Sequence, residues 1–172
     1  MTGGAKGIDP CAHLLPKVTV PGESVDQNMK EAQNQVASLR MQTALASPDG
    51  TPMADLPGGA IDAWFFSMVA AHQPWDYKDR DPEGAAKGNS IYEDFGNFNY
   101  GATGGAAGYS LNVLQHMAGF VENYKNQGMK SRNMVEARAG IGGQYPYGDK
   151  FEDAKQIENG FAYFNCRKAN SK

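Results

Sequence analysis

The segment Tyr92-Glu93-Asp94-Phe95-Gly96-Asn97-Phe98-Asn99-Tyr100-Gly101-Ala102-Thr103-Gly104-Gly105 combines carboxylates, carboxamides and aromatic rings with four glycines. In a helix interior each glycine costs about 1 kcal/mol relative to alanine, so this composition argues against a regular helix. The segment does not alternate cleanly enough to be a half-buried strand either. We therefore expect residues 92–108 to form an irregular glycine-rich loop, whose polar side chains build a site.

Helical patterns flank this segment on both sides. Ser24 or Asp26 can cap a helix that ends near Leu45, and Ser110 can cap another that runs to about residue 124. An almost entirely apolar helix is expected over residues 60–72, in the centre of the core. A last helix begins near Phe151 or Asp153, and its predicted buried positions are Phe151, Ala154, Ile157, Phe161 and Phe164.

These patterns predict a mainly α, single compact domain over residues 24–172, preceded by an extended arm over 1–23. Loops are expected over 47–59 and 128–148, with a short helix over 133–139. The alternative fold is a lysozyme-like α+β arrangement with a small irregular β element.

The bulk composition limits the classes of function. The chain has 172 residues, 41% hydrophobic content and a net charge of −3, which suits one core and does not favour wrapping a nucleic-acid backbone. We find no apolar run that could span a bilayer and no hydrophobic segment of a secretory signal peptide. We therefore expect no membrane insertion, synthesis in the cytoplasm, and export by an apparatus other than the general secretory route.

Two cysteines, Cys11 and Cys166, lie near opposite ends of the chain. In a chain without a signal peptide we expect two unrelated thiols. The alternative is a bridge that forms in an oxidising compartment such as the periplasm and ties the two ends together. The three histidines are scattered and no Cys-x-x-Cys is present, so we predict neither a metal site nor a cofactor.

The chemistry of the glycine-rich segment centres on Glu93. Its apolar neighbours Tyr92 and Phe95 are expected to raise the pKa of its carboxyl, as a general acid requires. Asp76 or Asp94 is the candidate second carboxylate of a glycosidase. The predicted substrate-binding residues offer hydrogen bonds or flat surfaces: Trp75, Tyr77, Lys78, Asn97, Asn99, Tyr100 and Thr103.

Two other interpretations of these residues are open. Glu93 and Asp94 can instead cap a helix or satisfy turn amides. For metal-independent RNA cleavage, the best acid–base pair in the chain is His72 with Lys78, although His72 also suits the C-terminal end of a helix. His116 falls beside an apolar stripe, so we expect it to be structural.

Three motifs together resemble the bacterial toxin 44 family of polymorphic toxins. They are Trp75-Asp76-Tyr77-Lys78, the segment from Tyr92 to Gly104, and Tyr147-Gly148-Asp149 followed by Asp153, Ile157 and Gly160. The resemblance covers residues 60–165 and assigns the family motif to Asp76, Lys78, Glu93, Asn97 and Asn99. It implies a toxin used against competing bacteria, delivered by a specialised secretion apparatus and neutralised by a cognate immunity protein.

The leading hypothesis is an antibacterial hydrolase that cleaves the peptidoglycan glycan in the target-cell periplasm, with Glu93 as general acid. The second is an RNase that acts in the target-cell cytoplasm. The third is a non-enzymatic binding module.

Overall fold

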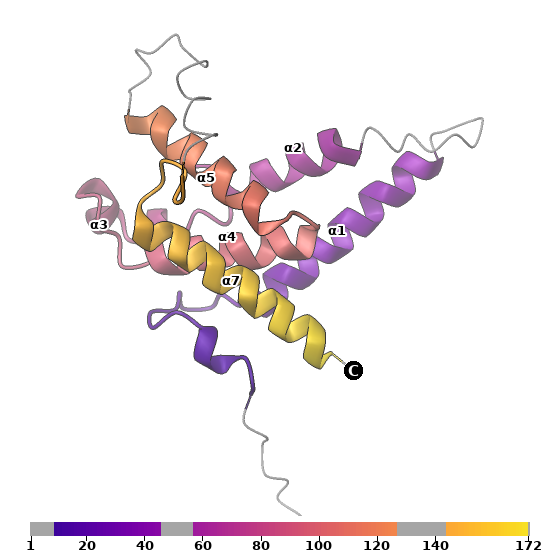
Figure 1. Ribbon diagram of the computed structural model, residues 1–172, viewed down its shortest axis with the longest axis horizontal. Helices are drawn as coiled ribbons and strands as arrows, with labels where there is room; N and C mark the ends of the chain where they lie inside the picture. The colour runs from indigo at the N-terminus through magenta and orange to yellow at the C-terminus, as the bar shows by residue number, and fades with distance from the viewer. Residues whose placement is uncertain (1–8, 46–56, 127–143, 172) are drawn as a thin grey trace, which may run out of the picture.

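The computed structural model describes residues 9–45, 57–126 and 144–171, and these residues form an assembly of helices (Figure 1). No strand occurs within those ranges, so the prediction of a mainly α fold is confirmed and the α+β alternative is not supported. The predicted short helix over 133–139 lies outside the described residues. The helices are α1 (Val25–Leu45), α2 (Pro57–Val69), α3 (Pro82–Ala86), α4 (Glu93–Ala107), α5 (Leu111–Asn126) and α7 (Phe151–Asn170), with short 3-10 helices η1 (Ala12–Leu14) and η2 (Tyr77–Arg80).

The predicted helix starts are largely correct. The Ser24 hydroxyl accepts a hydrogen bond from the Gln27 amide at 3.3 Å, and the Ser110 hydroxyl accepts one from the Val113 amide at 3.3 Å. Both serines therefore cap their helices as expected. Two core predictions are wrong: Phe66, in the helix that was expected in the centre of the core, is 57% exposed on α2, and Phe151 is 58% exposed on α7.

The prediction of an irregular loop over residues 92–108 is wrong, because this segment forms the regular helix α4. Its glycines lie where other helices come close to its backbone. A Cβ added at Gly101 would overlap the Ile157 carbonyl, and one added at Gly104 would overlap the Leu114 side chain. The burial gained by this close packing offsets the low helix propensity of glycine.

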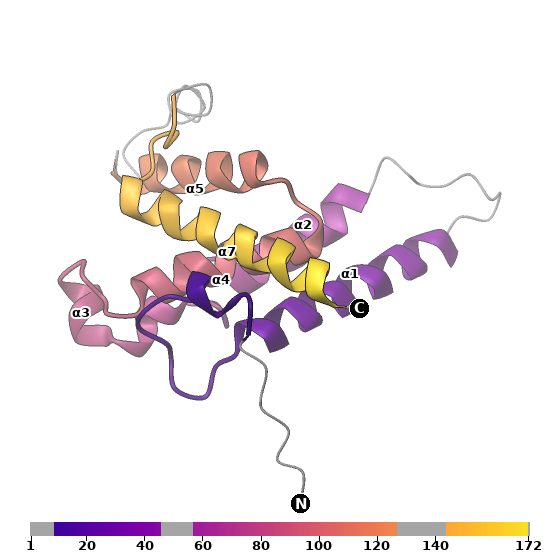
Figure 2. The same ribbon diagram turned by 60° about the horizontal axis from the view of Figure 1, so that its bottom comes forward.

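Helices α4 and α7 lie side by side in both views (Figures 1 and 2), and α7 carries a matching glycine. A Cβ added at Gly160 would overlap the Phe98 carbonyl. The two backbones can therefore touch, and the large residues beside the glycines fill the surrounding core. Phe95, Phe98, Ile157 and Tyr163 are each no more than 2% exposed.

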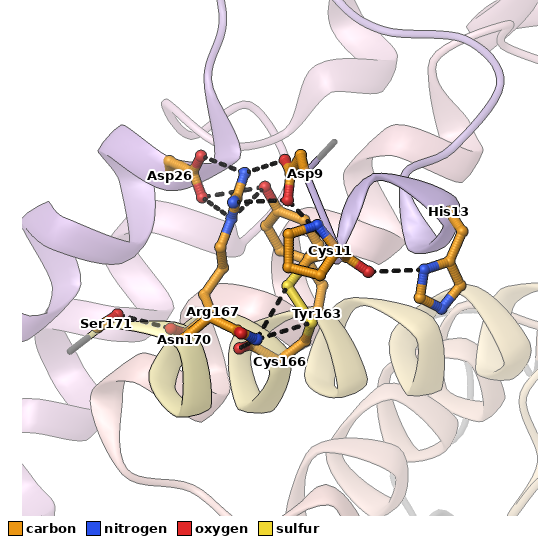
Figure 3. The surroundings of a disulfide bond; sticks show 10 residues. Asp9, Cys11, His13, Asp26, Tyr163, Cys166, Arg167, Asn170 and Ser171 are labelled. Carbon is orange, nitrogen blue, oxygen red and sulfur yellow. Dashed lines mark hydrogen bonds and ion pairs between the residues drawn. A yellow bond between two sulfur atoms is a disulfide. The ribbon is translucent and has the colours of Figure 1, made fainter. Parts of the chain in front are cut away.

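A disulfide and an arginine join the N-terminal residues to α7 (Figure 3). Cys11 is bonded to Cys166, so the expectation of two unrelated thiols is wrong and the bridge is the correct alternative. The Arg167 guanidinium donates to Asp9 at 2.9 Å and to Asp26 of α1 at 3.0 Å. Residues 9–11 of the arm are thus fixed to α7, and Arg167 links them to α1.

No helix among the described residues is long and apolar enough to cross a membrane.

Gly160→Ala and Gly101→Ala are expected to destabilise the protein by about 1–3 kcal/mol, because the new methyl group must displace a facing backbone. Gly96→Ala, also in α4, is the matched control, since its Cβ would meet no atom within 4 Å. It should stabilise the protein by up to about 1 kcal/mol through helix propensity. Urea denaturation of the three variants measures both effects, and stabilisation by all three would contradict the close contact.

Replacing both cysteines, Cys11→Ser with Cys166→Ser, should lower the free energy of unfolding by about 3–5 kcal/mol, because the bridge closes a loop with a sequence separation of 155. Thermal denaturation with and without a reductant measures this loss. Reductant should destabilise the wild type and leave the double variant unchanged. Equal melting temperatures for oxidised and reduced wild type would contradict the prediction.

Candidate active site

A cluster of charged side chains lies where α4 and α7 begin. We call Lys78, Glu93, Asp149, Lys150 and Asp153 the ionic cluster. Lys78 Nζ is 2.7 Å from Glu93 Oε1, and Lys150 Nζ is 3.5 Å from the same oxygen and 3.8 Å from Asp153 Oδ2. Glu93 and Asp153 belong to the first turns of their helices, where the N-terminal end of the helix dipole favours a carboxylate.

Asp149 is placed by a turn that packs on α5. Its amide donates to the Pro146 carbonyl at 3.1 Å, and its carboxylate accepts from the Lys150 amide at 2.9 Å. A Cβ added at Gly119 of α5 would overlap the Tyr147 carbonyl, so glycine is needed for the turn to approach. The turn is further fixed by stacking of Tyr147 on His116, whose ring centroids are 3.9 Å apart.

Tyr147 has a φ of 59°, in the left-handed region that non-glycine residues rarely adopt. Such backbone strain clusters at functional sites, where the surrounding structure holds it in place. Here the strained residue lies two positions before Asp149. The expectation that His116 is structural agrees with its contact to this turn.

The two carboxylates Glu93 and Asp149 have opposite pKa shifts. Burial raises the pKa of Glu93, but the hydrogen bond and charge of Lys78, with the charge of Lys150, outweigh burial and lower it overall. The predicted rise at Glu93 is therefore wrong, because the flanking aromatic rings matter less than the two lysines. Burial raises the pKa of Asp149 to about 6, and the charge of Asp153 adds to that rise.

The pKa of Asp153 is raised, like that of Asp149. Burial first, and then the charge of Glu93, raise the pKa of its carboxyl, while Lys150 and Lys78 oppose the rise. The cluster thus favours the ionised form of Glu93 and the protonated forms of Asp149 and Asp153. A pair of carboxyl groups with pKa values moved apart is the arrangement that separates an acid from a base.

Asn97 lies one turn after Glu93 on the same face of α4. Its side-chain nitrogen is buried and has no hydrogen-bond partner among the residues that the structure describes. A buried donor of this kind beside the ionic cluster suits a substrate hydroxyl or carbonyl.

Several predicted substrate-binding residues lie in the core instead of on a surface. Trp75 is 6% exposed and packs edge-on against Trp64, so it offers no exposed platform for a sugar ring. Asn28 of α1 donates to the Tyr77 hydroxyl at 2.7 Å and to Asn99 Oδ1 at 2.9 Å. This fully buried network joins α1, η2 and α4 and has a structural role.

Two further hydroxyl groups are used within the fold. Thr103 is fully buried and donates to the Asn99 carbonyl at 2.7 Å. The Tyr100 hydroxyl donates to the Leu114 carbonyl of α5 at 3.1 Å. Of the predicted substrate-binding residues, Lys78 and Asn97 lie at or beside the ionic cluster.

Asp94 and Asp76, the two candidates for the second carboxylate, are not part of the ionic cluster. Asp94 lines a separate cavity with residues 13–17 of the arm. Asp76 accepts a hydrogen bond from the His72 amide at 2.9 Å, and the two residues form an exposed group with Asp79 whose ligand atoms lie within 4.8 Å of one another. That group has the geometry to hold a cation, and the hydrogen bond that the His72 ring donates to Asp79 raises the pKa of His72.

Asp149, Lys150 and Asp153 are not among the site residues that were predicted from the sequence. The signal that could have found them is the motif Tyr147-Gly148-Asp149 with a second carboxylate four residues later. This spacing puts two acidic groups around the start of a helix.

A sequence model of a family described as bacterial toxin 44 matches residues 64–166 of the chain. The match spans every residue of the ionic cluster, from Lys78 to Asp153. No curated protein and no solved structure matches the chain.

Asp149→Asn is expected to stabilise the protein at pH 8 more than at pH 4. The native pKa of about 6 lies above the ordinary value of 3.8, so the native state holds a proton that the unfolded state releases between these values. Above pH 6 the wild type must bury the charge, and after discounting for solvent screening of this partly exposed group the cost is on the order of 1–2 kcal/mol, which asparagine avoids. Urea denaturation at both pH values measures the difference, and an equal effect at both would contradict the raised pKa.

Proposed function

The chain belongs to the bacterial toxin 44 family, and we propose that it is an antibacterial toxin that hydrolyses the glycan strands of peptidoglycan in the target-cell periplasm. The observation that carries the proposal is the opposite pKa shift of Glu93 and Asp149 within one cluster. Hydrolysis of a glycosidic bond requires one carboxyl that is protonated and another group that is ionised.

In the proposed mechanism Asp149 is the general acid. A pKa of about 6 leaves a fraction of its carboxyl protonated as the pH approaches neutral, and this proton passes to the oxygen of the leaving sugar, so that the glycosidic bond breaks without release of an alkoxide. Glu93 stays ionised through Lys78 and stabilises the positive charge that develops on the sugar, or activates the attacking water. These roles replace the expectation that Glu93 is the acid, because the lysines lower its pKa.

The remaining side chains of the site suit a polar substrate. The buried side-chain nitrogen of Asn97 is a donor for a sugar hydroxyl or N-acetyl carbonyl. Lys150 is half exposed at the edge of the cluster and keeps negative charge from accumulating beside Glu93 and Asp153.

The disulfide supports action in an oxidising compartment. A bridge between Cys11 and Cys166 forms and persists in the periplasm and is disfavoured in the cytoplasm.

Membership of a toxin family supports two proposals about partners. We propose that a specialised secretion apparatus delivers the toxin and that a cognate immunity protein blocks the ionic cluster. Obstruction of this half-buried site is the simplest means of inhibition.

The alternative of a cytoplasmic RNase receives less support from the contacts. His72 is paired with Asp79 at 2.7 Å, whereas Lys78 is paired with Glu93 at 2.7 Å. The two members of the predicted acid–base pair are thus bound to different carboxylates. The net charge of −3 also gives no general attraction to RNA.

Asp149→Asn and Glu93→Gln should each lower the turnover number for release of soluble fragments from purified sacculi by about 10²–10⁴-fold, as expected for loss of acid–base catalysis. Glu31→Gln, on the exposed face of α1, is the matched control and should be fully active. In bacteria, the wild type should kill when fused to a periplasmic signal. Killing from the cytoplasm with RNA degradation would instead support the RNase.

A further inference from the structure

A cavity of about 320 Å³ lies between the N-terminal arm and the helices α4 and α7. Residues 13–17 of the arm form one wall. Asp94 of α4 and Gln156 and Asn159 of α7 line the rest. This volume is in the range of sites that hold a small ligand.

We propose that this cavity is a saccharide-binding subsite for the same glycan that the ionic cluster cleaves. This inference rests on the proposed function and extends it to a second set of residues. The two carboxamides and the carboxylate supply donors and acceptors for hydroxyl and N-acetyl groups. Leu14, Leu15 and Pro16 supply apolar contact for the C–H face of a sugar ring.

The charges that line the cavity favour a saccharide over a strongly charged ligand. Lys17 and Asp94 bring one charge of each sign, so the wall has no excess charge for a polyanion such as RNA. Amide side chains, by contrast, are neutral and offer both a donor and an acceptor. A sugar chain presents the same mixture of groups along its length.

The cavity and the ionic cluster border the same ends of α4 and α7. Asp94 directly follows Glu93, and successive helical residues point in directions about 100° apart. Gln156 lies one turn after Asp153, a distance of about 5 Å along the α7 axis. In this proposal, a polymer bound at the cluster extends past the first turns of both helices into the cavity.

The wall formed by the arm is held by the contacts at its N-terminal side (Figure 3). Cys11 is bonded to Cys166, and Asp9 Oδ2 lies 2.8 Å from the Arg167 guanidinium. His13 follows two residues after Cys11, and its ring is 2.9 Å from the Pro10 carbonyl. Reduction of the disulfide should loosen this wall and weaken the subsite.

The test is titration calorimetry of the oxidised 172-residue chain with the disaccharide of N-acetylglucosamine and N-acetylmuramic acid. Gln156→Leu combined with Asn159→Leu should raise the Kd at least tenfold, because the hydrogen bonds of two carboxamides to the sugar are lost. Gln27→Leu with Asn34→Leu, the same residue types on the exposed face of α1, is the matched control and should change the Kd less than twofold. Reduced wild type should bind several-fold more weakly than oxidised wild type.

Three results would each overturn the subsite. They are unchanged binding by the Gln156 and Asn159 variant, an equal loss of binding in the control, and no binding by the wild type. Sacculus digestion separates this result from the proposed function. If the wild type releases fragments and the variant has an unchanged KM, the subsite is wrong and the hydrolase is right. If the wild type binds the disaccharide but releases no fragments, and the variant does not bind the disaccharide, the subsite is right and the hydrolase is wrong.

Discussion

The contact between the backbones of α4 and α7 governs the rest of this structure. Gly101 meets the Ile157 carbonyl, and Gly160 meets the Phe98 carbonyl, so neither position has room for a side chain. The contact puts the first turns of both helices at one end of the molecule, and Glu93 and Asp153 belong to those turns. The arrangement that buries the core is therefore also the arrangement that assembles the ionic cluster.

The same contact explains which parts of the fold the sequence predicts. The periodic apolar stripes and capping serines of α1 and α5 are local signals, and the helices begin where these signals indicate. The glycines of α4 carry a local signal against a helix, and that signal is overridden by burial against α7 and α5. Gly160 of α7 has the same role as Gly101 of α4, but the two residues are far apart in sequence and no local pattern indicates that their helices pack together.

The site shows a similar division between local and long-range information. Lys78 and Glu93 belong to motifs that the sequence singles out, and the structure joins them by an ion pair of 2.7 Å. Trp75, Tyr77 and Asn99 belong to the same motifs but are buried, because the motifs also carry the polar and aromatic contacts of the core. Composition alone does not separate these roles, since both require polar and aromatic residues close together.

The pKa values follow from which partner reaches which carboxylate. Glu93 and Asp149 are both partly withdrawn from water, and burial alone would raise the pKa of each. Lys78 reaches Glu93 directly and reverses the shift there, whereas Asp149 has the carboxylate of Asp153 as a neighbour. The pKa values of the two carboxyl groups are thus distinguished by two lysines and not by the apolar residues beside Glu93. Since the turn that carries Asp149 packs on Gly119 of α5, the difference between the two carboxyl groups depends on helix packing as much as on charge.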